Sequence, residues 1–307
     1  MSDKVDAHAL NDALAASFML VDFQLRQWGA KVTDKAASAE VITSKGAARN
    51  SGKFVKNLLV GADAELLAVQ QLGNAARAHV YANTVPWSNN TTGAKRGDRL
   101  INAKKTFEFL KTLNHIVQEH NAAVVALEKV WDQRVQQGLA NLGGLADPGD
   151  YPTAADVASR ISISVDVVPV PSMSDFSRTS LPPELAQALG QRLADQTVAQ
   201  FDNARADIKK RLLDELERMA KQLGKAGRGD KTRLYDSLVT NMQGLVGLAR
   251  SMNVTGNPEL TALTDKIEMQ LLKEPVEVYR NHPTKAVEVA NAAAQLAVDA
   301  AIDEVWK

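Results

Sequence analysis

The feature that most constrains this chain is a run of apolar residues between Asp98 and Gly138 that recurs at alternating steps of three and four. Such spacing predicts one long amphipathic helix with a broad apolar face. At 1.5 Å per residue, a helix of ~40 residues would extend roughly 60 Å, so other helices must cover that face. The positions on this seam are Leu110, Leu113, Val117, His120, Val124, Leu127 and Trp131.

A second long helical pattern extends from Glu184 to Leu223 and suggests that helices dominate the fold. Aromatic residues make up only 5% of the 307 residues, so Leu, Val and Ala must form most of the core. Leu and Ala lose little side-chain freedom in a helix, which favours an all-helical framework. Further helices are expected at Asp3–Ala16, Thr33–Ser44, Phe54–Asn83 with an interruption at Gly61, Thr153–Ser159, about Lys231–Met252, Pro258–Lys273 and Pro283–Trp306.

Two segments alternate apolar and polar residues and therefore predict strands with one buried face, Val21–Trp28 and Ile161–Val167. A lone strand would leave its backbone groups unpaired, so we expect residues 18–27 and 161–168 to pair. The expected fold is mainly α, an elongated helical bundle with two long helices and a small two-stranded β-sheet. It would form one domain over residues 1–307, with a subdivision into 1–180 and 181–307.

The charge balance of the chain excludes a global basic field, because 36 Lys and Arg residues face 36 Asp and Glu residues. Any electrostatic binding must therefore come from local patches. The absence of cysteine excludes disulfides, thiolate metal sites and a cysteine nucleophile. The charged N-terminus and the lack of an apolar run of ~18 residues predict a cytoplasmic protein without a membrane anchor.

The tripeptide Arg-Gly-Asp occurs at residues 96–98 and 228–230, each time before a predicted helix. A cell-adhesion motif is one interpretation, but Asp is also a favoured N-cap residue. Capping is the interpretation we prefer for both copies.

Histidine and glycine clusters offer little chemistry. His115 and His120 are five residues apart and do not share a helix face, so a core position for His120 is favoured over a metal site. The glycines near residues 93–97 and 224–229 spell neither a Walker A loop nor a dinucleotide fingerprint. No cofactor and no transition-metal site are expected.

Local basic groups are the most suggestive binding feature. One group lies in the linker after the second predicted helix and comprises Lys45, Arg49, Lys53 and Lys56. The other surrounds Trp87 in the loop before the predicted helix of residues 98–138, which we call the spine helix. It comprises Lys95, Arg96, Arg99, Lys104 and Lys105. Basic side chains beside an exposed aromatic ring can hold a single-stranded nucleic acid, whereas a Trp87 packed against the helices would leave the lysines as solvated loop residues.

Several short motifs, taken in order, resemble an uncharacterised domain family of phages, prophages and Proteobacteria. They are Trp28-Gly29, Thr84-Val85-Pro86-Trp87, Gly97-Asp98-Arg99-Leu100, Asp150-Tyr151-Pro152, Pro169-Val170-Pro171, Asp175-Phe176 and Asn253-Val254-Thr255. The family pattern would have Asp-Phe-Arg at this place. This chain departs from it, because Asp175-Phe176 is followed by Ser177 and only then by Arg178. The resemblance implies gene neighbours of the MoxR-type ATPase and von Willebrand A-type families, and it implies no catalytic residues.

The expected function is a non-enzymatic interaction or adaptor protein in a phage- or prophage-type complex, with a protein partner such as a MoxR-type ATPase, or with a second copy of the chain. The alternative is a single-stranded nucleic-acid-binding protein that uses Trp87 and its basic neighbours. An enzyme is a third hypothesis, but no constellation of residues supports it.

Overall fold

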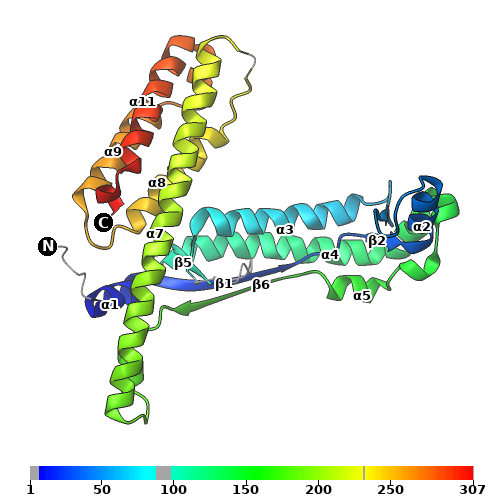
Figure 1. The fold of residues 1–307 in the computed structure, drawn as a ribbon, viewed down its shortest axis with the longest axis horizontal. Helices are drawn as coiled ribbons and strands as arrows, with labels where there is room; N and C mark the ends of the chain where they lie inside the picture. Colours follow the sequence, from blue (N-terminus) through cyan, green and yellow to red (C-terminus); the bar gives the residue numbers. More distant parts are fainter. Residues whose placement is uncertain (1–6, 88–97, 231, 307) are drawn as a thin grey trace. The chain divides into compact units, whose positions relative to one another are not determined.

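The computed structural model describes residues 7–87, 98–230 and 232–306, and the fold is mainly α (Figure 1). The chain divides into two compact units. Unit 1 comprises Met1–Asp22, Val80–Phe109 and Asp166–Lys307, and unit 2 comprises Phe23–His79 and Leu110–Val165. Each unit is built from separated stretches of sequence, which differs from the subdivision at residue 180 that the sequence suggested.

Unit 1 is organised around helix α7, which contains 45 residues. Helices α11, α8 and α1 pack against α7, and α9 packs against both α8 and α11. Figure 1 shows α7, α8, α9 and α11 side by side. The helices of this unit are α1 (Ala7–Ser17), α6 (Ser174–Ser177), α7 (Pro183–Gly227), α8 (Ser237–Ser251), α9 (Pro258–Leu271), α10 (Val276–Asn281) and α11 (Pro283–Ala301), with a 3-10 turn η4 (Asp303–Trp306).

The core of unit 1 follows one stripe of α7. Its buried positions recur at steps of three and four, because neighbouring turns of a helix bring such residues onto one face. This stripe includes Phe201, Ala204, Ile208, Leu212, Leu216, Met219 and Leu223. The same core continues into α8, α9 and α11, and it reaches Phe18, Val85 and Leu100.

A four-stranded sheet has the order β4-β5-β1-β6. Its strands are β4 (Val85–Pro86), β5 (Arg99–Asn102), β1 (Phe18–Arg26) and β6 (Ser162–Pro169). Strand β1 pairs antiparallel with β5, with Leu20 opposite Leu100, and β5 pairs antiparallel with β4. The predicted pairing of β1 with β6 is confirmed, but the prediction of a two-stranded sheet was wrong. The two additional strands are β4, which lies directly before Trp87, and β5, which lies at the start of the predicted spine helix. Both are too short to show a period in the sequence.

Unit 2 contains most of the two helices α3 (Ala64–Asn83) and α4 (Thr106–Leu142), with the short helices α2 (Lys35–Ser44) and α5 (Ala154–Ser159). Leu66, Val69 and Leu127 lie in its core. Trp131 packs edge-on against Trp28 with 5.4 Å between ring centroids, and its indole N–H donates to the carbonyl of Pro152 at 3.1 Å.

The spine helix α4 is shorter at its start than the sequence indicated. It begins at Thr106, because Arg99–Asn102 pairs with β1 instead of continuing the helix. Within the predicted seam Leu113, His120, Leu127 and Trp131 are buried, and the other three positions are partly exposed. The helical period therefore indicated the buried face of α4 correctly. The start of the helix is set instead by the pairing of β5 with β1.

A small second sheet replaces part of a predicted helix. Strand β3 (Phe54–Asn57) pairs antiparallel with β2 (Lys31–Asp34), so the expected helix over residues 54–60 was wrong. Gly61 adopts a φ of 68° in the turn that follows, where a glycine is tolerated without strain. Helix α10 was not anticipated, and α8 begins at Ser237, several residues after the expected start.

Neither Arg-Gly-Asp copy caps a helix. A strand follows Asp98, whose backbone carbonyl accepts a hydrogen bond from the Trp87 N–H at 2.9 Å. Asp230 is several residues from the start of α8 and lies near Arg228, at 3.8 Å between carboxylate and guanidinium. Two other residues do cap helices through their side chains: Thr153 caps α5 and Asn257 caps α9.

A matched pair of glycine substitutions tests the packing of α4. A Cβ on Gly138 would lie 2.2 Å from the backbone oxygen of Leu58, whereas a Cβ on Gly244 in α8 would meet no atom within 4 Å. Alanine is favoured over glycine in a helix by roughly 1 kcal/mol. We therefore expect Gly244→Ala to raise the unfolding free energy by about 1 kcal/mol and Gly138→Ala to lower it, as measured by urea unfolding followed by circular dichroism. A stabilising Gly138→Ala would contradict this packing.

Candidate functional site

Trp87, which the sequence offered as an exposed binding residue, lies in the core of unit 1. Only 6% of its surface is exposed, and it belongs to the same cluster as Phe201 and Leu212 of α7. A buried indole cannot stack on a base or fill a partner's pocket without leaving this core. The hypothesis of an exposed tryptophan therefore does not agree with the structure.

Arg99 is half-buried and binds the end of α3. Its Nε donates to the hydroxyl of Thr84 at 2.6 Å, and its Nη2 donates to the Thr84 carbonyl at 3.0 Å. The guanidinium also lies 4.1 Å from the centre of the Tyr81 ring, a cation–π distance. Burial lowers the pKa of Arg99, which still titrates far above neutral pH.

Arg211 of α7 binds the same helix end. Its Nη2 donates to the Tyr81 carbonyl at 3.0 Å, and its Nη1 lies 3.5 Å from the carboxylate of Asp207, four residues earlier on α7. The last carbonyls of a helix lack intrahelical donors and carry partial negative charge. Arg99 and Arg211 donate hydrogen bonds to carbonyls at the C-terminus of α3 and bring positive charge to it, so their role here is structural.

The remaining residues of the predicted Trp87 site do not form a cluster in the described part of the chain. Lys95 and Arg96 lie outside the described residues. Lys104 is exposed, and the ammonium of Lys105 donates to the carbonyl of Gly247 in α8 at 3.0 Å. The structure thus joins Trp87 and Arg99 to the core of unit 1 and leaves Lys104 at the surface.

Lys56, which the sequence placed with the basic linker residues, is buried in unit 2. Its ammonium lies 2.5 Å from the carboxylate of Asp150 and 3.2 Å from that of Asp34, and it donates to the Leu145 carbonyl at 3.0 Å. The hydrogen bond to Asp150 raises the pKa of Lys56, so the amine stays protonated. A protonated lysine is neither a nucleophile nor a general base. The cluster joins β2 and β3 to the 3-10 turns after α4, which contain Leu145 and Asp150.

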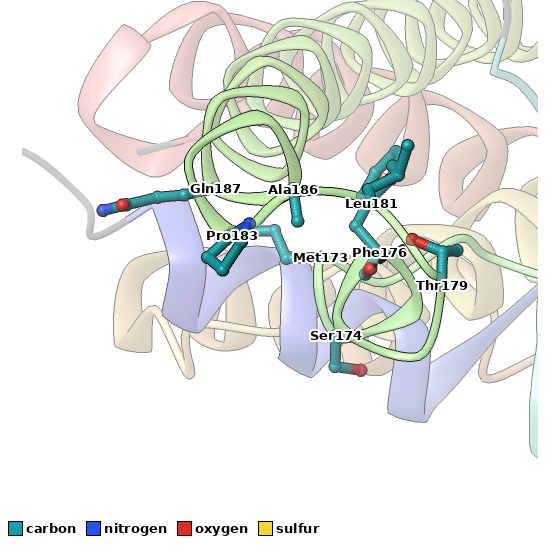
Figure 2. A pocket seen from close by; sticks show the side chains of 8 residues that line it. All are labelled: Met173, Ser174, Phe176, Thr179, Leu181, Pro183, Ala186 and Gln187. Carbon is teal, nitrogen blue, oxygen red and sulfur yellow. Dashed lines mark hydrogen bonds between the residues drawn. The ribbon is translucent and has the colours of Figure 1, made fainter.

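An apolar pocket of about 460 Å³ lies where α6 meets the first turn of α7 (Figure 2). Apolar side chains form most of its wall, and Ser174, Thr179 and Gln187 contribute polar atoms. The apolar lining residues are Met173, Phe176, Leu181, Pro183 and Ala186.

A buried polar network fixes the position of this pocket. The side chain of Asn11 in α1 is fully buried; it donates to the Pro171 carbonyl at 3.1 Å and to the Thr197 hydroxyl at 3.2 Å, and it accepts from the Met173 N–H at 3.0 Å. Met173 in turn packs closely on Gly190, where a Cβ would lie 3.2 Å from its methyl group. Because these bonds join α1, the segment directly before α6, and α7, the pocket is held in place before any ligand binds.

Sequence reasoning missed this pocket. Its signal was a group of apolar residues, Met173, Phe176 and Leu181, in a proline-containing passage that has no helical or strand period. Apolar residues in such a passage have no element of their own to pack in, so they either cover another core or remain available to a ligand. The sequence alone does not separate these two outcomes.

The described residues hold no group of three or more His, Asp or Glu side chains arranged for a metal ion. No helix among them is both long enough and apolar enough to cross a bilayer. Comparison of the chain with protein-family models, with curated proteins and with solved structures gave no match.

His120 on α4 is fully buried, as the prediction of a core position required, and neither ring nitrogen has a hydrogen-bond partner within the described structure. Burial lowers the pKa of His120 below the ~6.5 of an unfolded chain. The unfolded state therefore binds the proton more tightly, and stability is complete above about pH 6.5 and is lost as the pH falls toward the folded-state pKa.

Replacing His120 by Leu tests this account. We expect wild-type protein to lose stability as the pH falls below about 6.5, and His120→Leu to lose less, as measured by urea midpoints. The control is His115→Leu on the same helix, because His115 is exposed and its Nε2 lies 3.5 Å from Glu119. Equal pH dependence in wild type and His120→Leu would refute the assignment of a buried neutral imidazole.

Proposed function

We propose that this protein is a non-enzymatic interaction protein whose partner inserts an apolar side chain into the pocket between α6 and α7. The observation that carries the proposal is a preformed apolar pocket of about 460 Å³, held by the buried Asn11 network. Protein interfaces concentrate their binding energy in apolar or aromatic anchors that fill such pockets.

The chemistry of the described polar clusters supports the non-enzymatic part of the proposal. The buried ammonium of Lys56 and the guanidinium groups of Arg99 and Arg211 bind carboxylates or backbone carbonyls of the fold itself. Catalysis instead requires groups that are directed at a substrate with a matched pKa. The proposal rests on this contrast and on the apolar lining of the pocket between α6 and α7.

The partner we propose to test first is a MoxR-type ATPase from the same host, because the short motifs of the sequence resemble a family that occurs beside such genes. The setting would be a phage- or prophage-type complex. The alternative, a single-stranded nucleic-acid-binding protein based on Trp87, has no such support, since Trp87 is in the core.

A pocket-filling substitution and a matched control test this function. Ala186 is half-buried and lines the pocket, whereas Ala188, two residues further on α7, is exposed and does not line it. We expect Ala186→Phe to weaken binding of the purified ATPase at least tenfold, about 1.4 kcal/mol. Ala188→Phe should leave the affinity unchanged, as measured by isothermal titration calorimetry.

Three results would contradict the proposal. Equal affinities for wild type and Ala186→Phe would exclude the pocket as the docking site. No binding by wild type would exclude the ATPase as the partner. A dimer that Ala186→Phe abolishes, seen by light scattering, would make a second copy of this chain the occupant.

A further inference from the structure

The segment from β2 to the start of β3 concentrates positive charge in unit 2. Residues 31–53 contain five cations and two carboxylates, a net charge of +3 in a chain whose total net charge is zero. All five cations are exposed. We call these residues, Lys31, Lys35, Lys45, Arg49 and Lys53, the basic surface.

The β2–β3 pairing separates this positive charge from the buried ion cluster. Residues along a strand alternate between its two faces. Thr33 pairs with Val55 and both are exposed, as is Lys31 two residues earlier, whereas Asp34 and Lys56 belong to the opposite face and its buried cluster. Asp34 and Phe54 form the last pair of the ribbon. Lys35 comes directly after Asp34 and Lys53 directly before Phe54, so both lie at this end of the ribbon.

The cations of the basic surface are not used by the fold. Within the described residues none of the five side chains forms an ion pair or hydrogen bond with another part of the chain, unlike Lys56, Arg99 and Arg134. The Debye length is only about 8 Å at physiological ionic strength. The local charge therefore acts on a ligand even though the rest of the chain balances it.

Helix stability explains only one of these five positions. Lys45 is the C-cap residue of α2, where a cation is favourable. Lys35 occupies the first turn of the same helix, where a cation is unfavourable. Arg49 and Lys53 lie in the loop before β3, outside any helix.

We propose that the basic surface binds the phosphate backbone of a nucleic acid. Besides the cations it offers exposed hydroxyl groups of Thr33, Thr43 and Ser51, which are also common phosphate ligands. Phe54 is the one aromatic residue in the segment 31–54, and it is partly buried at the end of the β2–β3 ribbon. Contacts to phosphate without base stacking give binding that is independent of sequence.

An anionic membrane surface is the main competing ligand, and the composition of the segment argues against it. Helices that lie on membranes present Trp, Phe or Leu to the acyl chains. Helix α2 has the sequence KAASAEVITS, and its apolar residues larger than Ala are only Val41 and Ile42. This helix therefore lacks the face that would insert into a bilayer.

The salt dependence of duplex binding tests the proposal. For full-length protein and a fluorescent DNA duplex of about 20 base pairs, five phosphate contacts predict a slope of about −4.5 in log Kobs against log salt, or roughly a 500-fold loss between about 50 and 200 mM. In the triple variant Lys45→Gln, Arg49→Gln and Lys53→Gln, we expect a slope of about −1.8 and roughly a 12-fold loss.

The control removes the same charge from dispersed exposed positions, with Lys129→Gln, Arg192→Gln and Lys210→Gln. We expect this variant to keep the wild-type slope, and both triple variants to keep the wild-type melting midpoint. An unchanged slope in the first variant, or an equal change in both, would overturn the proposal. Absence of duplex binding by wild type, or preferential binding to phosphatidylserine-containing vesicles, would do the same.

Discussion

The shared core of unit 1 is the constraint on which the rest of that unit depends. The buried stripe of α7 contacts the apolar faces of the helices around it. Phe18, Val85 and Leu100 from the sheet belong to the same cluster, as does Trp87 directly after β4. A helix of 45 residues gains most of its stability from such packing and little from propensity. Short strands such as β4 and β5 also persist because their side chains enter this core, since isolated pairs of strands are marginal in water.

Charge in this molecule has two distinct uses. Arg99 and Arg211 donate to the carbonyls at the end of α3, and Lys56 forms ion pairs with two carboxylates inside unit 2. A cation with such partners contributes to the fold and offers little to a ligand. The basic surface around Lys45 and Arg49 has no such partners in the described structure, and for this reason we infer binding there instead of near Trp87.

The sequence predicted the elements whose period is long enough to be measured and missed those set by distant partners. Helices α4 and α7 and the pair β1 and β6 were predicted because apolar residues recur over many turns or pleats. Strands β3 and β5 contain four residues each, and their state is decided by pairing with β2 and β1. The same limitation applied to sites: basic neighbours made Trp87 look like a binding residue, and only tertiary packing shows that it is buried. The pocket near Pro183 left no periodic signal at all.

The central claim, that Trp87 belongs to the core of unit 1 and not to a binding surface, is tested most directly by thermal unfolding of Trp87→Ala. Truncating a buried tryptophan typically costs about 3–5 kcal/mol, so the account predicts a clearly lower unfolding midpoint than in wild type. Lys104→Ala, a change at an exposed residue of the same predicted site, should leave the midpoint unchanged. A Trp87→Ala variant that unfolds at the wild-type temperature would contradict the shared core and return Trp87 to the surface.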